Sequence, residues 1–233
     1  MSPSTNSDSS RLFLIRHGTV AGLWRRRIYG DLDVPLSDQG RAEARRCAEG
    51  LAETSLAAVV SSGLARAEYG AALLRAGRGL PRRDEPDLRE IDRGAWRGRP
   101  YDSAEAGAVA DWERWLADPE TLRPPGGESL GDLRDRVLPA LDRLAQECEG
   151  RAAAVVTHAW VVRVAVLSAL GAPLARAPLF EVRPGSLVAL DWPARFDSGL
   201  RPTLAGFQLD RPPAPGTTWF RGPSRDPAPG SRG

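Results

Sequence analysis

Two apolar runs of strand length each end at a histidine. Residues 12–15 are followed by Arg16 and His17, and residues 152–157 are followed directly by His158. Short continuous apolar runs are typical of strands buried on both faces, and parallel strands deliver their last side chains to one edge of a sheet. The chain contains no other histidine. The pattern therefore predicts that both histidines lie in one site at that edge.

Helical and strand patterns alternate between the two histidines. Residues 38–53 repeat apolar positions at helical spacing after Ser37, a good N-cap, and residues 57–60 have the pattern of a short buried strand. Ser61 and Ser62 are expected to cap a second helix over residues 63–75. This alternation predicts an α/β fold, namely a three-layer α/β/α sandwich whose mostly parallel central sheet is covered on both faces.

The middle of the chain is less regular. Residues 88–98 mix charges, glycines and an aromatic side chain, which is typical of a loop over a site. Residues 103–116 are expected to form a helix. Its Trp112 and Trp115 lie three positions apart, and we interpret them as packing residues in preference to a ligand stack.

Helical spacing returns from Leu130 to Cys148, where Pro139 is expected to introduce a kink. Another helix is expected over residues 161–170. Residues 186–192 and 203–209 have the pattern of late strands at an edge of the sheet.

The length of 233 residues suits one domain with a sizeable core. We assign that domain to residues 11–210, with residues 84–128 as a cap or substrate-selecting region. Residues 1–10 are polar, which is typical of a disordered tail and unlike a signal peptide. Residues 211–233 are rich in proline, glycine and arginine and are expected to form a second disordered tail.

Composition narrows the chemistry. All 32 basic residues are arginine, which excludes a Schiff-base lysine and a lysine-bearing P-loop. The net charge is only +2 with acidic residues interspersed, so no nucleic-acid partner is expected. No run approaches the ~20 apolar residues of a membrane span, so we expect a cytoplasmic protein with no membrane partner. Cys47 and Cys148 lack metal-type spacing and are interpreted as buried apolar side chains, with no metal site.

Six motifs, in this order, resemble those of the histidine phosphatase superfamily, in the branch that contains phosphoglycerate mutases and small-molecule phosphatases. They are residues 16–18 (Arg-His-Gly), residues 30–36, Ser61-Ser62 with Arg66, residues 88–98, residues 125–129 and residues 155–158. The resemblance spans residues 11–209. It implies a phosphoglycerate mutase-like fold and phosphoryl transfer through a phosphohistidine, without a cofactor.

The resemblance also implies roles for individual residues. His17 is expected to be the nucleophile that becomes phosphohistidine, and Arg16 and Arg66 are expected to bind the phosphate. A guanidinium suits this role because it binds two oxygens at once and stays charged. Adjacent cations disfavour imidazolium, so His17 is expected to be neutral and able to attack. His158 is expected to donate a hydrogen bond to the phosphate.

The leaving alkoxide needs a proton, and Glu90 is the expected donor. In the family the matching glutamate donates this proton. In the second half-reaction it acts in reverse, as the base that takes a proton from the attacking water. Asp92 and Glu128 are the rival carboxylates.

Further pocket residues are expected from the same resemblance: Thr19, Arg27, Thr157 and Trp160. Arg27 matches a family position that lines the pocket, with a surface arginine as the alternative. Trp160 places a large ring close to His158, where the family has a small residue.

Several positions depart from the family pattern. Thr19-Val20 replaces the usual Glu-Thr, and Leu23 stands where an asparagine commonly contacts phosphate. Thr19 or backbone amides are the candidates for the missing donor. Trp24, Tyr29 and Trp160 form either an aromatic wall for a ring-bearing substrate or ordinary packing.

Three functional interpretations follow. The first is a phosphohydrolase, of histidine acid or phosphomonoester phosphatase type, acting as a monomer or homodimer on a small phosphomonoester that ranges from a sugar phosphate to a nucleotide-like ester such as α-ribazole phosphate. The second is a 2,3-bisphosphoglycerate-dependent mutase. This is disfavoured because the chain lacks the longer insertion and lysine-bearing tail of that group. The third is a non-catalytic scaffold that keeps the fold.

Overall fold

One five-stranded sheet organises the chain. A computed structural model describes residues 9–101, 108–193, 201–210 and 212. The strands are β1 (Ser9–Arg16), β2 (Ala58–Ser61), β3 (Ala152–Thr157), β4 (Leu187–Pro193) and β5 (Thr203–Leu209). Their order across the sheet is β2-β3-β1-β4-β5.

The sheet is parallel on one side and antiparallel on the other. β1 and β2 both pair parallel with β3, while β4 runs antiparallel to β1 and β5 runs antiparallel to β4. The β1–β3 pairing ends with Arg16 opposite Thr157. The next residue on each strand is a histidine, so the register itself brings His17 and His158 to the same edge.

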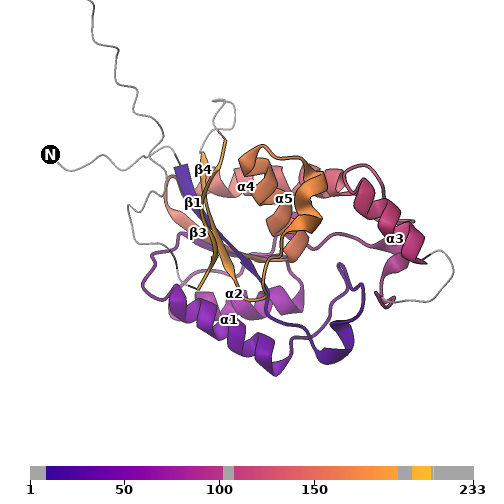
Figure 1. Cartoon of the computed structure of the whole chain (residues 1–233). Coiled ribbons are helices and arrows are strands. Elements are labelled where there is room, and N and C mark those ends of the chain that lie inside the picture. The colour runs from indigo at the N-terminus through magenta and orange to yellow at the C-terminus, as the bar shows by residue number, and fades with distance from the viewer. Residues whose placement is uncertain (1–8, 102–107, 194–200, 211, 213–233) are drawn as a thin grey trace, which may run out of the picture.

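Helices cover both faces of the sheet. They are α1 (Asp38–Gly50), α2 (Ala65–Arg75), α3 (Ala108–Ala117), α4 (Leu130–Cys148) and α5 (Ala159–Leu170), with 3₁₀ turns η1 (Gly22–Trp24), η2 (Pro86–Leu88), η3 (Gly94–Trp96) and η4 (Leu174–Leu179). Figure 1 shows α1 and α2 on one face, α4 and α5 on the other, and α3 to one side of the sheet. The three-layer α/β/α prediction is therefore confirmed.

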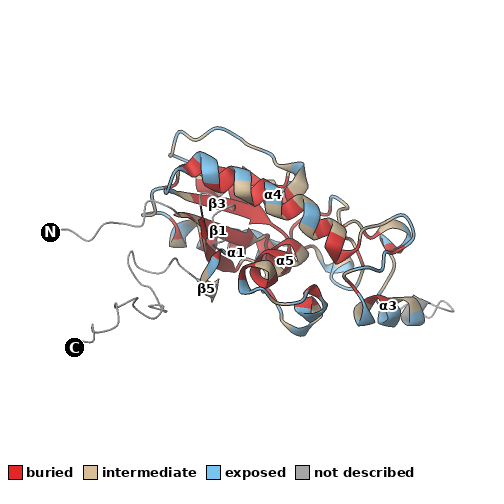
Figure 2. Cartoon of the chain, turned by 90° about the horizontal axis from the view of Figure 1, so that it is seen from above, coloured by how far each residue is buried: buried red, intermediate tan, exposed pale blue. Residues whose placement is uncertain are grey.

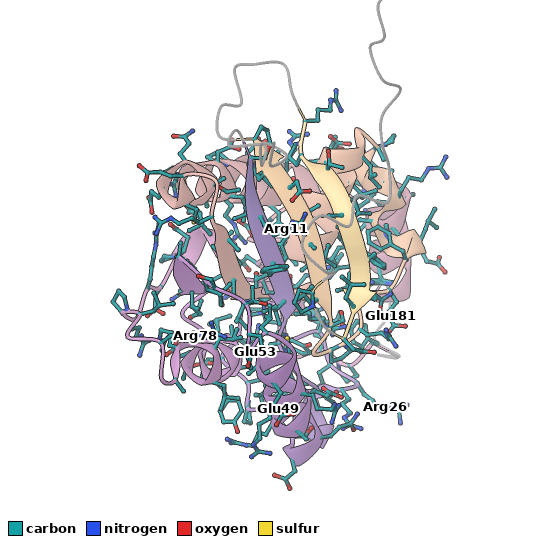
Figure 3. The ribbon with its side chains drawn as sticks, turned by 90° about the vertical axis from the view of Figure 1, so that its left-hand side faces the viewer. Arg11, Arg26, Glu49, Glu53, Arg78 and Glu181 are labelled. Carbon is teal, nitrogen blue, oxygen red and sulfur yellow. The ribbon has the colours of Figure 1, made fainter. Side chains whose placement is uncertain are left out.

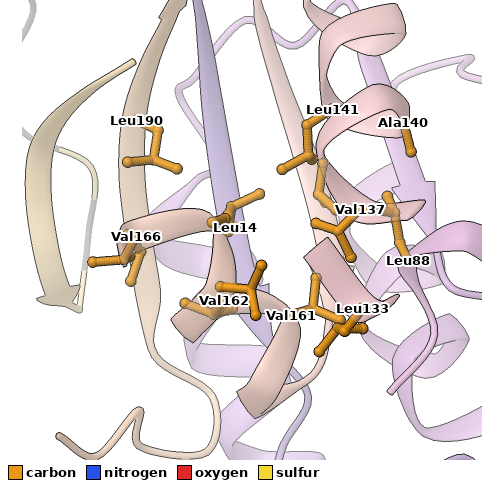
Figure 4. Close-up of a cluster of buried hydrophobic side chains, with 14 of the residues drawn as sticks. Leu14, Leu88, Leu133, Val137, Ala140, Leu141, Val161, Val162, Val166 and Leu190 are labelled. Carbon is orange, nitrogen blue, oxygen red and sulfur yellow. The ribbon is translucent and has the colours of Figure 1, made fainter. Parts of the chain in front are cut away.

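Successive residues of β1 face opposite cores because side chains alternate along a strand. Leu12 and Leu14 belong to the core beneath α4 and α5, whereas Phe13 and Ile15 belong to the core beneath α1 and α2. Figure 2 shows the buried sheet between its helical layers. Figure 4 shows Leu14 and α4 and α5 side chains such as Val137 and Val162 within one cluster.

Local predictions had mixed outcomes. Ser37 caps α1 by accepting a hydrogen bond from the Gly40 amide, as expected. The expected Ser61-Ser62 cap of α2 is wrong, because the N-cap is Leu64 and no side chain caps the helix. The two serine hydroxyls instead contact Asp84 and His158.

Expected boundaries shift by a few residues. β1 begins at Ser9, inside the segment assigned to the N-terminal tail, because the buried Ser10 hydroxyl donates to the Ala145 carbonyl. The helix expected from residue 103 is observed as α3 from Ala108. Residues 1–8, 102–107, 211 and 213–233 lie outside the described residues, and with them most of both expected tails.

Polar side chains outside the site mostly hold the fold together. Arg11 on β1 forms an ion pair with Asp191 on β4, its neighbour in the register, and Arg78 donates to the carbonyls of Leu51 and Thr54 after α1 (Figure 3). Cys47 and Cys148 are free and buried. None of the helices in the described ranges combines the length and apolar character needed to cross a bilayer.

Candidate active site

His17 and His158 meet at the carboxyl edge of the parallel strands. Their ring centroids lie 5.1 Å apart, and both rings are buried. His17 follows β1 directly, and its amide donates to the Thr157 carbonyl at the end of β3. His158 is the N-cap of α5. The sequence-based prediction that the two histidines share one site agrees with this geometry.

The backbone contact of His17 defines its tautomer. Nδ1 lies 2.7 Å from the Gly18 carbonyl oxygen, and a carbonyl only accepts, so Nδ1 carries the hydrogen. Nε2 is buried and has no partner among the described residues. The neutral ring therefore presents the Nε2 lone pair. Burial lowers the pKa of His17 well below its usual value, and the Arg66 and Arg16 charges lower it further.

A close backbone crossing holds the segment after His17. A Cβ on Gly18 would lie 2.1 Å from the Gly40 carbonyl oxygen, and a Cβ on Gly40 would lie 2.0 Å from the Thr19 carbonyl oxygen. Both positions require glycine because real side chains do not approach backbone atoms so closely. The start of α1 thus fixes the loop that carries the Gly18 carbonyl.

His158 is held from the other side by Ser62. Nε2 of His158 lies 2.7 Å from the Ser62 hydroxyl, whereas Nδ1 is buried without a described partner. Burial lowers the pKa of His158 well below its usual value, and Arg66 is the charge that lowers it most. The sequence predicts Ser62 only as a helix cap and as part of a family motif, and no local pattern indicates its contact with His158.

Main-chain carbonyls hold two arginines beside the histidines. Arg66 donates from Nη2 to the Gly30 carbonyl at 2.7 Å and from Nη1 to the Leu32 carbonyl. Arg16 donates from Nη1 to the Val182 carbonyl. Each has a buried Nε without a partner, and neither forms an ion pair with a described carboxylate. Main-chain carbonyls therefore position these cations and leave their charge available for an anion.

Arg16, His17 and Arg66 also line one small cavity between the sheet and the α1–α2 layer. Its other walls are mostly apolar: Ile15, Gly18, Ala44, Cys47, Gly70, Leu74 and Val156. The two guanidinium-bearing residues and the nucleophile candidate thus share a single hollow.

Glu90 lies against the start of α5. Its Oε1 accepts hydrogen bonds from the amides of Trp160, at 3.2 Å, and Ile91, at 3.1 Å. Thr157 donates its hydroxyl to the Leu88 carbonyl at 2.7 Å, which fastens the segment before Glu90 to the end of β3. Thr157 therefore acts on the position of the Glu90 loop.

The two rival carboxylates are engaged elsewhere. Glu128 forms an ion pair with Arg136 at 2.8 Å and accepts from the Asp92 amide. Asp92 is paired with Arg97 at 2.6 Å. Glu90 is buried, at 5% exposure, and is joined to no arginine by an ion pair in the described residues, which distinguishes it from Asp92 and Glu128.

Other expected pocket residues have different partners. The Thr19 hydroxyl and amide both donate to the carboxylate of Glu43 on α1. Both Thr19 donors therefore bind α1 and not an anion. Arg27 donates to the Gly98 carbonyl at 2.7 Å and joins two loops. Leu23 is 67% exposed.

The three aromatic residues do not form one wall. Tyr29 lies edge-on to His17, with centroids 6.4 Å apart, and beneath the Arg66 guanidinium at 5.3 Å. The Trp160 ring packs against Trp115, with centroids 5.2 Å apart, and the Trp160 amide donates to Glu90. Trp24 is half-buried in η1.

Arg93 and Arg163 were not predicted as site residues. Both lie near Glu90: burial lowers the pKa of each, and among charged neighbours the Glu90 carboxylate opposes that lowering most. Their chain positions carried no signal of this, because a charged residue in a loop or on a helix is usually exposed.

Comparison with known proteins agrees with this geometry. A sequence model described as the histidine phosphatase superfamily (branch 1) matches residues 12–197. Phosphoglycerate mutase-like protein 4 of Arabidopsis thaliana is 36% identical over 163 residues, which are 69% of this chain and 71% of that protein.

Solved structures of phosphatases are similar over most of the chain. A mycobacterial glucosyl-3-phosphoglycerate phosphatase has 30% identity and a TM-score of 0.75, with 86% of this chain and 99% of that chain covered. The α-ribazole phosphatase of Shigella flexneri has 25% identity and a TM-score of 0.74, with 86% and 97% covered.

Proposed function

The chain belongs to branch 1 of the histidine phosphatase superfamily, and from this membership we propose that it is a phosphohydrolase that removes phosphate from a small phosphomonoester through a phosphohistidine on His17. The observation that carries the proposal is the state of the His17 ring. Nδ1 is held by the Gly18 carbonyl, and among the described residues Nε2 has no partner and the two neighbouring guanidinium groups form no ion pair. This is the arrangement that an uncharged nitrogen nucleophile needs for attack on an anion.

In the first half-reaction, Nε2 of His17 attacks phosphorus and forms the P–N bond. The P–O bond to the alcohol breaks, and Glu90 gives the leaving oxygen its proton. Arg16, Arg66 and His158 bind the phosphoryl oxygens, where negative charge accumulates. Burial of the site strengthens these interactions because little water screens them.

In the second half-reaction, water attacks the phosphohistidine. The Glu90 carboxylate takes a proton from the water, the P–N bond breaks, and inorganic phosphate leaves with His17 restored. Glu90 therefore ends the cycle protonated, as it began. In this scheme Glu90 transfers the proton in both half-reactions, and residues 84–128 select the small-molecule substrate. We also propose that the protein is cytoplasmic and acts as a monomer or a homodimer.

The curated relatives named for phosphoglycerate mutase support a second candidate, a bisphosphoglycerate-dependent mutase. A mutase returns the phosphoryl group to a second substrate oxygen, whereas a phosphatase gives it to water. Incubation with 3-phosphoglycerate and 2,3-bisphosphoglycerate separates the two. Phosphate release without fast isomerisation supports the phosphatase, and fast isomerisation without phosphate release supports the mutase.

Hydrolysis of p-nitrophenyl phosphate by the wild type and His17→Ala tests catalysis itself. The wild type is expected to turn over and the variant to lose at least about 10³-fold in kcat, because no other group replaces the nucleophile. Equal rates would support a scaffold that keeps only the fold.

A further inference from the structure

Arg136 on α4 binds the main chain of the segment that carries Glu90. Its Nη1 donates to the carbonyls of Asp87, at 2.7 Å, and Arg89, at 2.9 Å. Its Nη2 donates to the carbonyl of Glu90 itself at 3.1 Å. One side chain of α4 therefore holds three of the carbonyls of residues 87–90.

Glu128 orients Arg136 and extends these contacts along the segment. Its two carboxylate oxygens accept from Nε and Nη2 of Arg136, each at 2.8 Å. Oε2 also accepts from the Asp92 amide at 2.9 Å, and the Glu128 amide donates to the Asp92 carbonyl at 2.9 Å. The pair therefore ties Asp92, as well as residues 87–90, to the start of α4.

Each N–H group of the Arg136 guanidinium has an acceptor. A guanidinium has five such donors, and the contacts above use one from Nε and two from each terminal nitrogen. The other arginines of α4, Arg134 and Arg143, pair with side-chain carboxylates instead. Since the planar fork is rigid, five simultaneous acceptors define one orientation of the Arg136 side chain and of the carbonyls that it binds.

The β3 side of the same segment is fixed by Thr157, whose hydroxyl donates to the Leu88 carbonyl at 2.7 Å. All four main-chain carbonyls of residues 87–90 thus accept from a side chain of β3 or α4. The Glu90 carboxylate extends from this fixed main chain to the first turn of α5, where it accepts from the Trp160 amide.

Two other arginines near Glu90 contact aromatic rings. The Arg93 guanidinium carbon lies 4.2 Å from the ring centroid of Trp115 on α3 and 4.9 Å from that of Trp160 on α5. The Arg163 guanidinium carbon lies 4.5 Å from the centroid of Trp160. Both are charged neighbours of the Glu90 carboxylate, whereas Arg136 binds the main chain from which that carboxylate extends.

We propose, resting on the phosphatase function above, that Arg136 is a positioning residue for proton transfer by Glu90. It acts by fixing the main chain from which the Glu90 carboxyl reaches the leaving oxygen, and Glu128 supports it by fixing the guanidinium. A proton donor must lie within hydrogen-bond reach of the oxygen that it protonates. A displacement of about 1 Å can cost on the order of 10²-fold in rate, so the hold on this segment matters for the chemistry.

A purely structural role for Arg136 makes a different prediction. If the ion pair with Glu128 only joins α4 to the loop, its loss lowers stability and slows the hydrolysis of every ester by the same factor. If Arg136 acts through Glu90, the loss falls on esters whose leaving group needs a proton.

The test compares kcat/KM for glycerol 3-phosphate and p-nitrophenyl phosphate in Arg136→Lys, which keeps the charge but has three donors on a single nitrogen. We expect a fall of at least about tenfold for glycerol 3-phosphate, because a displaced Glu90 protonates the alkoxide poorly. For p-nitrophenyl phosphate we expect less than about a threefold fall, because p-nitrophenolate leaves without a proton. Arg134→Lys, at an arginine of the same helix that pairs with Glu120 and Asp135, is the matched control and leaves the ratio of the two esters unchanged.

A double-mutant cycle with Glu90→Gln shows whether Arg136 acts through Glu90. Substitutions that act through one group are not additive, so in the Glu90→Gln background Arg136→Lys should change kcat/KM for glycerol 3-phosphate by less than about twofold. If Arg136→Lys does not fold, Glu128→Gln takes its place in both measurements. That variant keeps an oxygen for the Asp92 amide but removes the charge that orients Arg136, so it should also slow glycerol 3-phosphate more than p-nitrophenyl phosphate.

The results distinguish the role of Arg136 from the function on which it rests. An equal fall for both esters in the folded variant, or the same large loss again in the Glu90→Gln background, overturns the positioning role and leaves the phosphatase function standing. A wild type that hydrolyses neither ester contradicts the phosphatase function, and the role of Arg136 with it.

Discussion

The Ser62 hydroxyl lies 2.7 Å from Nε2 of His158, so a serine decides which nitrogen of the second histidine faces the site. The Leu64 amide donates to the same hydroxyl oxygen at 3.4 Å. In the arrangement we favour, Ser62 accepts from the amide and donates to Nε2, which leaves the proton of neutral His158 on Nδ1. That N–H is then the one available to a phosphate oxygen.

Replacing Ser62 with alanine tests this assignment. We expect Ser62→Ala to lower kcat/KM about tenfold, because loss of one orienting hydrogen bond is worth about 1.4 kcal/mol. Ser61→Ala is the matched control, since the neighbouring hydroxyl binds Asp84 and not a histidine. Steady-state kinetics on an alkyl phosphate provides the measurement. Equal effects of the two substitutions would show that Ser62 does not orient His158.

Glu90→Gln separates proton donation from substrate binding. The amide keeps an oxygen for the Trp160 and Ile91 N–H groups but has no proton to transfer. We expect kcat/KM, which reports the first half-reaction, to fall by roughly 10²–10³ for glycerol 3-phosphate, whose leaving alkoxide needs the proton. For p-nitrophenyl phosphate the fall in kcat/KM should be less than about tenfold, because p-nitrophenolate leaves without a proton.

The rival carboxylate supplies the control for that experiment. Asp92→Asn alters a side chain already paired with Arg97, so any loss should be the same for both leaving groups. If Asp92→Asn slowed the two substrates unequally and Glu90→Gln slowed them equally, Asp92 and not Glu90 would be the proton donor.

Stability should fall as the pH drops below about 6.5, the usual histidine pKa. Burial holds the pKa of both histidines well below that value in the folded protein, so below pH 6.5 the unfolded chain binds protons that the folded chain does not. Each histidine should contribute a slope that approaches about 1.4 kcal/mol per pH unit. Urea unfolding at several pH values between 7.5 and 5.5, in a buffer without phosphate, measures this slope.

A single substitution shows whether the histidines cause this slope. His158→Gln removes one of the two groups and should reduce the slope by about half. An unfolding free energy that stays constant across the window in the wild type would mean that the rings take up protons at the same pH in the folded and the unfolded chain.

The histidine site was predictable because it follows from strand pattern and order. Strands β1 and β3 each end one residue before a histidine, and their parallel pairing in register brings the two histidines together. Arg93 was not predictable in the same way. Its burial depends on indoles from α3 and α5, which lie far from it in sequence, and no local pattern distinguishes such an arginine from a solvated one.

Two smaller differences have the same origin. Ser10 was assigned to a tail because it is polar, yet it lies within β1 with its hydroxyl bound to the Ala145 carbonyl. Thr19 was a candidate phosphate donor because it stands in a changed motif, yet its hydroxyl binds Glu43. In both cases a distant partner satisfies the polar group, and only the folded chain reveals the partner.

Trapping the phosphorylated enzyme tests the central claim most directly. The wild type is mixed with p-nitrophenyl phosphate, quenched in alkali, in which phosphohistidine survives, and digested for mass spectrometry. The account expects a phosphoryl group on His17 during turnover and none at that position in His17→Ala. Turnover with no phosphoryl group on His17, or with the group on another residue, would contradict it.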